Sequence, residues 1–248
     1  MKSRGDISVA AALALVALSA LPFFPTLHFG LVWDDSLLLT QVGTVAQSGG
    51  VPALFTTDFR LMADRPLGYY RPVTTTSLWV QVRDAWKTGG AGAMAGRARA
   101  LHTFNVILHV ICALLVWRIA RRLTRHAVAP WMAAALFAVH PAHVEPVAFI
   151  SARTDLLAAA FVLASVWCWL HMMHTRDRAR TTWLLLGAFF LLAGALAKEQ
   201  ALLLPVVLIA WTPLVKKKHR GWWRQNGGWL VAWLAVAVVA VGLRIAAH

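Results

Sequence analysis

The feature that most constrains the fold is a series of seven apolar runs that extends over nearly the whole chain. A hydrocarbon core about 30 Å thick takes roughly 20 apolar residues per helix. We expect spans at about 7–24, 102–117, 127–141, 151–171, 182–197, 201–214 and 229–243. With 59% hydrophobic and only 14% charged residues, the chain is too apolar for a soluble domain. The sequence therefore predicts an all-α polytopic membrane protein with about seven transmembrane helices.

The basic residues predict the orientation of these spans. Clusters at 118–125, 176–180 and 216–224, together with Lys2 and Arg4, hold 14 of the 24 lysines and arginines. Seven spans with a cytoplasmic N-terminus put all of them on the cytoplasmic side, as the positive-inside rule requires. The clusters then face anionic lipid headgroups. The sequence contains no basic patch interleaved with aromatic residues, which argues against a nucleic-acid-binding protein.

Two parts of this count have alternatives. The first run follows two basic residues and could be a cleaved signal peptide, but its length favours a membrane anchor. The fifth and sixth runs are short, and could form a re-entrant pair instead of two spans. Cys112 and Cys168 lie within apolar runs and are expected to be small buried side chains, because their spacing fits no metal site.

The chain is organised as a single membrane domain, residues 1–248. It comprises a first span at 1–30, an extracytoplasmic loop at 31–100 and the remaining helices at 101–248. The loop is too apolar to be disordered, and 35–46 is expected to form a helix along the membrane surface. Gly49-Gly50 and Gly89-Gly90 divide it. A long ordered loop of this kind is usually functional.

The adjacent acidic pair Asp34-Asp35, just after the first span, is the leading candidate for catalysis. Two neighbouring carboxylates repel each other, an arrangement that suits a general base or a metal ligand better than a structural role. A divalent ion at the pair is a further candidate ligand. The alternative is that one aspartate caps the helix that follows. Adjacent side chains point in different directions, so capping by one is compatible with reaction at the other.

Three further groups of ionisable residues lie at the outer ends of the predicted spans, where charge is costly unless it has a function. The first is Tyr69-Tyr70-Arg71-Pro72 with Thr74, Thr75 and Thr76, the second is His140, His143 and Glu145 with Arg153 and Asp155, and the third is Lys198-Glu199. Arg153 suits phosphate recognition, with Asp155 or Glu145 orienting it. Zinc at the histidines and structural ion pairs are the alternatives. His102, Asn105 and His109 share one helix face and either line the site or join helices.

Taken in order, several segments resemble the transmembrane O-mannosyltransferases that carry tetratricopeptide repeats, and their bacterial relatives in the GT-C superfamily of membrane glycosyltransferases. The matching segments are 29–35 (FGLVWDD), 70–75 (YRPVTT), 102–109 (HTFNVILH), 136–147 (LFAVHPAHVEPV), 151–157 (SARTDLL) and 197–199 (AKE). Their order and spacing are more specific than any single motif.

The resemblance implies a GT-C-like bundle whose first outer loop supplies the catalytic carboxylate. It also implies a polyprenyl-phosphate sugar donor, mannose in eukaryotic members, and a protein or glycan acceptor. Carried over, Asp34 is the expected base, with Asp35 as the second candidate. Arg153, Arg71, His140 and His143 are expected to bind the donor phosphate, supported by Glu145, Asp155, Tyr70, Lys198, Glu199, His102 and Asn105.

The family pattern continues into a C-terminal repeat domain that the 248 residues do not include. A fragment, a minimal form and one half of a split protein are the expectations that fit, and a separate repeat-containing or helical subunit is a candidate partner. A bacterial inner membrane is the expected location. The alternatives are a transporter or flippase for a lipid-linked sugar, which would normally carry ionisable groups at the bilayer midplane, and a non-catalytic subunit of a larger glycosylation complex.

Overall fold

The computed structural model describes residues 9–59, 69–175, 178–215 and 222–247, and helices dominate this part of the chain. The long helices are α1 (Val9–Ala20), which continues as the 3-10 helix η1 (Leu21–His28), α4 (Ala98–Leu123), α5 (Ala129–Val139), α7 (Arg153–Met172), α8 (Arg178–Ala197), α9 (Leu204–Val215) and α10 (Trp222–Ala247). The remaining elements are α2 (Asp34–Leu54), α3 (Pro72–Met94), α6 (Val144–Ala148), η2 (Ala95–Arg97), η3 (Pro141–His143) and η4 (Glu199–Leu203). The described residues contain one isolated bridge, between Phe59 and Tyr69, and no strand. The all-α prediction is confirmed.

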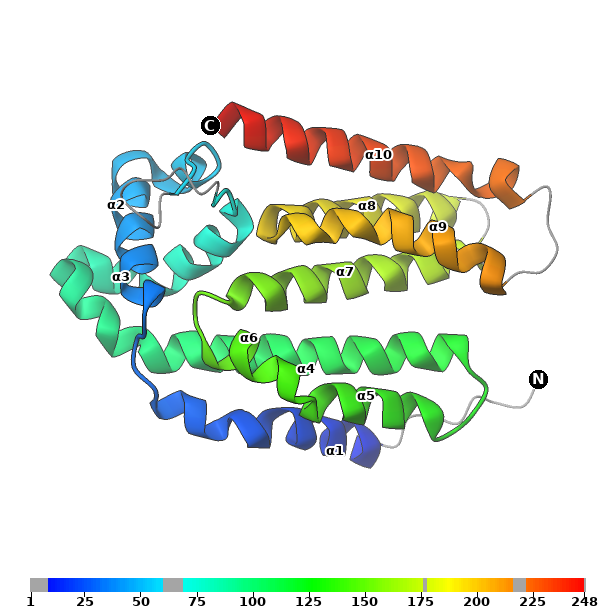
Figure 1. Ribbon diagram of the computed structural model, residues 1–248, viewed down its shortest axis with the longest axis horizontal. Coiled ribbons are helices and arrows are strands. Elements are labelled where there is room, and N and C mark those ends of the chain that lie inside the picture. The colour runs from blue at the N-terminus through cyan, green and yellow to red at the C-terminus, as the bar shows by residue number, and fades with distance from the viewer. Residues whose placement is uncertain (1–8, 60–68, 176–177, 216–221, 248) are drawn as a thin grey trace.

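The long helices run side by side, and each runs in the opposite direction to the one before it (Figure 1). The chain therefore crosses the same layer repeatedly. Five segments are long and apolar enough to cross a membrane: Val9–His28, Gly92–Leu123, Arg153–Met172, Arg178–Ala197 and Gly227–Ala247. Two shorter apolar helices, Ala129–Val139 and Glu199–Trp211, complete the series. The polytopic prediction is therefore confirmed, with five full-length spans and two short ones among the described residues.

Of the two runs expected to be short, the sixth is short and the fifth is not. The fifth run, expected to be short, is the 20-residue helix α8. The third run is short instead, because α5 has 11 residues and ends at Val139, where His140 and Pro141 follow. Proline favours an extended backbone in the residue before it, and His140 has an extended conformation at φ −67° and ψ 129°.

Small residues allow α7 and α8 to approach closely. A Cβ added at Gly187 would lie 3.4 Å from the Cβ of Cys168, and one at Gly194 would lie 3.4 Å from the Cβ of Phe161. The Ser165 hydroxyl donates to the Gly187 carbonyl at 2.8 Å. In lipid, helix association depends on such close packing and on interhelical hydrogen bonds.

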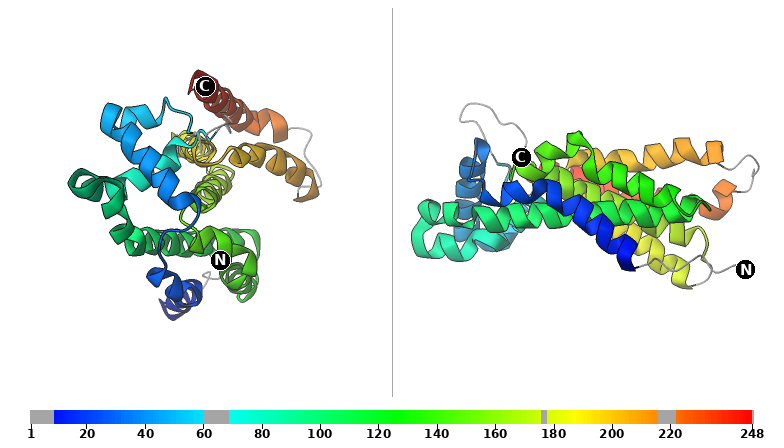
Figure 2. Two further views of the ribbon diagram at one scale, coloured as in Figure 1. Left: turned by 60° about the vertical axis from the view of Figure 1, so that its left-hand side comes forward. Right: turned by 90° about the horizontal axis from the view of Figure 1, so that it is seen from below.

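Two helices of the predicted outer loop, α2 and α3, cross one end of the bundle (Figure 2). They pack on each other and on the start of α4 around a core that includes Leu38, Leu39, Val42, Leu78, Val82, Met94 and Leu101. The expected glycine breaks are present, because α2 is kinked at Gly50 and α3 at Gly89 and Gly90. The loop helix expected at 35–46 is thus confirmed as part of α2.

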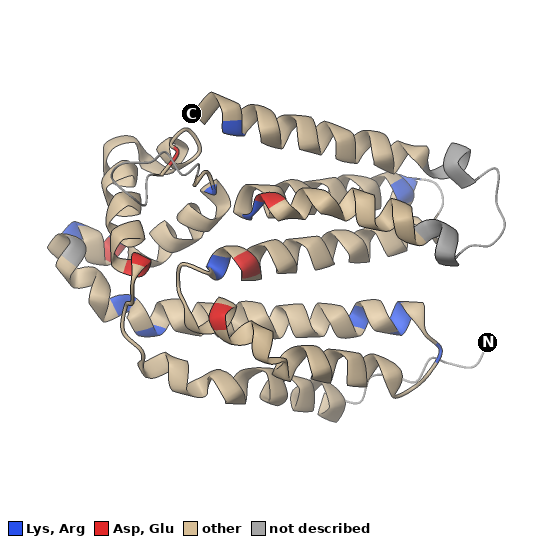
Figure 3. Cartoon of the chain, viewed as in Figure 1, with Lys and Arg blue, Asp and Glu red and all other residues tan. Residues whose placement is uncertain are grey.

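Charge is distributed unequally between the two ends of the bundle. The described acidic residues gather at the end that carries α2 and α3, whereas lysine and arginine occur at both ends (Figure 3). The opposite end carries Arg121 and Arg122 in the last turn of α4 and Arg178 at the start of α8. This distribution agrees with the positive-inside pattern, and the cytoplasmic location of the N-terminus stays a prediction.

Candidate functional site

The two aspartates of the acidic pair lie in opposite environments. Asp34 begins α2 and is exposed, whereas the side chain of Asp35 is fully buried. Ser151 donates to Asp35 Oδ1 twice, from its backbone N–H at 2.8 Å and from its hydroxyl at 2.7 Å. The backbone N–H of Val32 donates to Oδ2 at 3.1 Å. Three donors therefore satisfy the Asp35 carboxylate, while the Asp34 carboxylate faces outward.

The guanidinium of Arg153 lies at the centre of this end of the bundle and is fully buried. Its Nε donates to Asn105 Oδ1, its Nη1 to Gln81 Oε1 and its Nη2 to the Leu101 carbonyl, each at 2.8 Å. The Phe104 ring covers it at 4.8 Å. Arg153 thus joins α7 to α3 and α4. Neither Asp155 nor Glu145, which were expected to orient it, forms an ion pair with it among the described residues.

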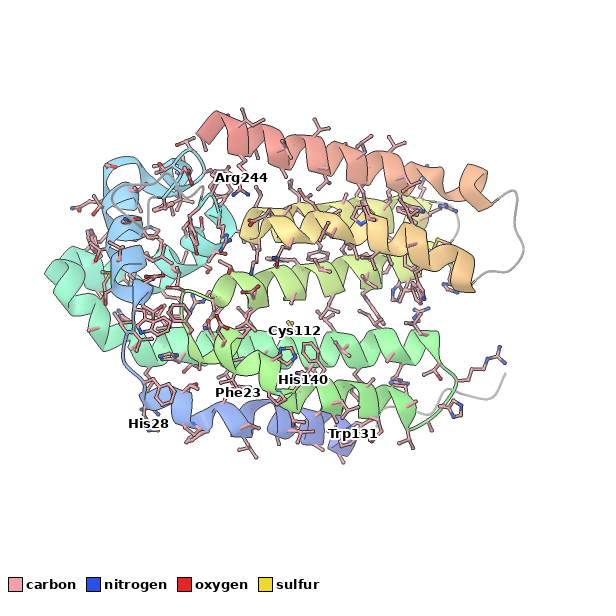
Figure 4. All side chains as sticks on the ribbon, in the orientation of Figure 1. Phe23, His28, Cys112, Trp131, His140 and Arg244 are labelled. Atoms are coloured by element: carbon pink, nitrogen blue, oxygen red, sulfur yellow. The ribbon has the colours of Figure 1, made fainter. Side chains whose placement is uncertain are left out.

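Arginine, lysine and carboxylate side chains form a second cluster where α3, α7, α8 and α10 meet. We call it the rim cluster, and it consists of Arg71, Asp155, Lys198, Glu199 and Arg244. Glu199 accepts from Arg71 at 3.5 Å and from Arg244 at 3.4 Å, and Lys198 pairs with Asp155. Figure 4 shows Arg244 near the end of α10, above the end of α8. The ion pairs hold the ends of four helices together.

The rim cluster shifts the pKa values of Glu199 and of the neighbouring Tyr69. Burial would raise the pKa of Glu199, but a backbone hydrogen bond and the charges of Arg71 and Arg244 bring it below its ordinary value. Burial raises the pKa of the Tyr69 phenol, and Arg71 opposes that rise. The Arg71 guanidinium lies 4.5 Å from the centre of the Tyr69 ring, and its buried Nε has no hydrogen-bond partner.

Tyr70 and the nearby threonines hold the start of α3 in place. The Tyr70 hydroxyl donates to the Phe55 carbonyl at 2.9 Å, and the Thr74 hydroxyl donates to the Ala197 carbonyl at 3.3 Å. Thr75 bonds within its own helix turn. These contacts attach the segment that carries Arg71 to both α2 and α8.

The histidines after α5 form an aromatic cluster. The ring of His143 lies 4.3 Å from that of Phe137 and 5.1 Å from that of His109, and His140 accepts a hydrogen bond from the Ala142 backbone. Burial and the neighbouring His140 lower the pKa of His143. The described residues contain no group of three His, Cys, Asp or Glu side chains able to hold a metal ion.

The polar face of α4 makes hydrogen bonds between helices. Asn105 donates to the carbonyls of Val147 and Phe149, both at 3.3 Å, besides accepting from Arg153. His102 contacts the Gly30 carbonyl at 3.4 Å, and His109 the Ala138 carbonyl at 3.0 Å. All three side chains of this face are buried. They hold the first loop and the α5–α7 connection against α4.

The structure thus groups the predicted residues differently from their order in the sequence. Asp35 is bonded to Ser151 and Val32, and Arg153 is bonded to Asn105. Arg71, Asp155, Lys198 and Glu199 belong to the rim cluster. His140 and Glu145 are exposed near α6. Three participants were not identified from the sequence: Ser151, Gln81 and Arg244. Ser151 lies in the family-like segment 151–157, but each of the three acquires its role only through a contact distant in sequence.

Comparisons with known proteins agree with these features. Residues 91–243 match the family model described as dolichyl-phosphate-mannose-protein mannosyltransferase. Protein O-mannosyl-transferase Tmtc2 of Drosophila melanogaster is 35% identical over 188 residues, which cover 73% of this chain and 19% of that protein. Protein O-mannosyl-transferase F38B6.6 of Caenorhabditis elegans is 28% identical, over 79% of this chain and 27% of that protein.

A human relative, protein O-mannosyl-transferase TMTC4, is 29% identical over 69% of this chain and 25% of its own length. The chain therefore spans about a fifth to a quarter of the curated relatives that it matches. No solved structure matches the chain.

Proposed function

The chain belongs to the dolichyl-phosphate-mannose-protein mannosyltransferase family, and we propose that it transfers a mannose-like sugar from a polyprenyl-phosphate donor to an acceptor hydroxyl outside the membrane. The relatives are named protein O-mannosyl-transferases, which supports the sugar and a protein acceptor, with a glycan as the alternative acceptor. A separate repeat-containing or helical subunit is part of the same proposal. A bacterial inner-membrane location stays a prediction, since these relatives are animal proteins.

One observation carries the proposal: an exposed carboxylate at a fixed backbone position, at the same end of the bundle as a cluster of cations. Asp34 is the base. It accepts the proton of the acceptor hydroxyl as the acceptor oxygen forms a bond to the anomeric carbon. The bond between that carbon and the phosphate oxygen breaks, the electron pair leaves with the phosphate, and the sugar configuration inverts. Asp35 has no such role, because three protein donors occupy its oxygens.

The rim cluster supplies the donor-phosphate site. It contains three cations, Arg71, Lys198 and Arg244, and two carboxylates, Asp155 and Glu199, so three minus two leaves one positive charge. A polyprenyl-phosphate sugar is a phosphodiester with one negative charge, which this surplus neutralises. Arg71 is held in this cluster by its ion pair with Glu199 and by the Tyr69 ring. Fixed charges of this kind stabilise a leaving phosphate without reorganisation.

The other residues expected at the phosphate receive different roles. Arg153 already donates to three protein acceptors, so its role is to hold the site together. His143 packs against Phe137 and His109, with His140 beside it, and its lowered pKa leaves its ring neutral near pH 7. In the proposed site it would donate a hydrogen bond to the substrate and would not act as a cation.

The acidic pair does not suit chelation of a divalent ion. A hard cation takes several oxygen ligands, but the oxygens of Asp35 accept hydrogen bonds from Ser151 and Val32, which leaves Asp34 as the one available carboxylate of the pair. The mechanism therefore contains no step that depends on a metal ion at this position.

The test uses the purified chain in lipid vesicles with a polyprenyl-phosphate mannose donor and a hydroxyl acceptor. We expect Asp34→Asn to abolish sugar transfer while membrane insertion and the elution profile stay unchanged. Asp84→Asn is the matched control, because Asp84 is an exposed acid on α3. Full activity of Asp34→Asn would rule out the base. Donor translocation without turnover would identify a flippase, and neither activity would identify a non-catalytic subunit.

A further inference from the structure

The backbone between the first span and α2 contains a tight turn with an unusual residue in it. Trp33 has φ 48° and ψ −118°, close to the first central position of a type II′ turn at about +60° and −120°. The N–H of Asp35 donates to the Val32 carbonyl at 3.0 Å, which closes the four-residue turn. Trp33 is the one described non-glycine residue with a positive φ. Glycine normally occupies this position, since any Cβ there is crowded.

A tryptophan in a glycine position is retained only where surrounding contacts determine the backbone. Here those contacts come from Asp35. Its buried carboxylate accepts from Val32 N–H on one oxygen and from both donors of Ser151 on the other. The first and last residues of the turn are therefore joined by two hydrogen bonds, one in each direction. The second oxygen attaches the turn to the loop before α7, 116 residues away in sequence.

The loop that carries Ser151 is itself fixed. Arg153 begins α7 two residues later and donates to α3 and α4 through three hydrogen bonds. The Phe149 ring contacts the Trp33 indole edge to face, with centroids 6.2 Å apart. Asp34 lies between the strained Trp33 and the buried Asp35. Its backbone is thus restrained on both sides, although its own carboxylate is exposed.

We propose that Ser151 is a positioning residue of the transferase: acting through Asp35, it keeps the Trp33 turn closed and so holds the Asp34 carboxylate against the acceptor hydroxyl. This inference rests on the proposed role of Asp34 as the base and adds the contacts that hold Asp34 in position. A general base must lie within hydrogen-bond reach of the proton that it removes, and displacement by about 1 Å lowers the rate by up to a hundredfold. Release of the turn moves Asp34 without touching the donor site in the rim cluster.

The experiment separates the kcat and donor KM of purified variants in lipid vesicles. Ser151→Ala removes one hydrogen bond and keeps the backbone donor, so the protein is expected to fold. We expect kcat to fall about tenfold with donor KM changed less than twofold, and Ser151→Thr to restore kcat because it keeps the hydroxyl. Ser165→Ala is the matched control: it removes another buried serine hydroxyl that joins two segments, distant from the turn, and kcat should be unchanged.

A double-mutant cycle with Trp33→Gly tests the link to the strained turn. Glycine adopts a positive φ without help, so Ser151→Ala should reduce kcat by a smaller factor in the Trp33→Gly background than in the wild type. Coupled residues show this kind of non-additivity. An equal penalty in both backgrounds would overturn the proposed link, as would a kcat for Ser151→Ala within twofold of wild type.

The outcomes also distinguish this inference from the proposed function. If Asp34→Asn is inactive and Ser151→Ala is fully active, the base stands and the positioning role fails. If Asp34→Asn retains activity, the base assignment itself fails, whatever Ser151→Ala does. If Ser165→Ala loses as much kcat as Ser151→Ala, then removal of any buried serine hydroxyl has this effect. That result would also overturn the positioning role.

Discussion

Replacing Arg153 with methionine should destabilise the protein much more than it affects donor binding. Methionine is of similar length and preserves most of the packing, but it leaves Asn105, Gln81 and the Leu101 carbonyl without their donor. A buried acceptor without a partner costs about 1–3 kcal/mol, and removal of one partner from a buried charged network about 3–5 kcal/mol. All three hydrogen bonds are 2.8 Å long and the guanidinium is fully buried, so we expect about 3–5 kcal/mol.

For a chain of this size, about 1 kcal/mol lowers the melting temperature by roughly 2–4 °C, so Arg153→Met should lose about 6–20 °C. The assay follows the monodisperse fraction of detergent-solubilised protein after heating. Arg83→Met is the control, because Arg83 is half exposed and pairs with Asp84 on the surface, where such pairs contribute about 0–1 kcal/mol.

Two results would refute the structural role of Arg153. One is a melting temperature within about 2 °C of wild type. The other is a variant of unchanged stability whose donor KM rises at least tenfold, which would make Arg153 the phosphate ligand after all. The network seen in the structure predicts the reverse pattern, loss of folded protein with little change in donor KM for the fraction that folds.

Three further predictions follow from individual contacts. Gly43→Ala should destabilise the α2–α3 pair by about 1–3 kcal/mol, because the new Cβ would lie 2.4 Å from the Trp86 ring; an unchanged melting temperature would contradict that packing. The ionised form of Glu199, whose pKa is lowered from 4.5, stabilises the fold above that pH, and this contribution is lost as the pH falls through the lower folded value. The melting temperatures of wild type and Glu199→Gln should therefore converge at low pH, and curves that stay parallel would argue against the ion pairs. Cys112 and Cys168 are buried, so maleimide should label neither in native vesicles and both after denaturation, and rapid native labelling would show that the helix contacts around them are wrong.

Much of the architecture was predictable because it depends on local composition. A run of apolar residues defines a span whatever surrounds it, and the glycine pairs at 49–50 and 89–90 break helices through their own backbone preferences. The exceptions are informative. The third run is shortened by His140-Pro141, and the fifth is a full helix because Arg178 and Arg180 are included in α8. Helix ends depend on a few residues, so hydropathy alone places them poorly.

The sequence indicated which part of the chain carries the candidate site, but not which of its residues are buried and which are exposed. The sequence marked Asp34, Asp35, Arg153 and Lys198 as ionisable residues at span ends, where desolvation makes them unusual. It gave no means of telling which would be buried. Arg153 was expected to bind phosphate, whereas Gln81, Asn105 and Leu101 occupy its donors. Arg244 lies in the last apolar run and became relevant only when α10 brought it to Glu199.

The sequence by itself determined that this chain is a bundle of membrane helices with an acidic pair beside its first span, because hydrophobicity and residue type are properties of the chain read locally. Only the tertiary structure decided how the adjacent aspartates differ. Ser151, 116 residues further along, approaches one of them and satisfies it with two donors, while Trp33 keeps the turn that leaves the other exposed. A hydrogen bond depends on distance in space, and that distance is set by how α4, α7 and α8 pack.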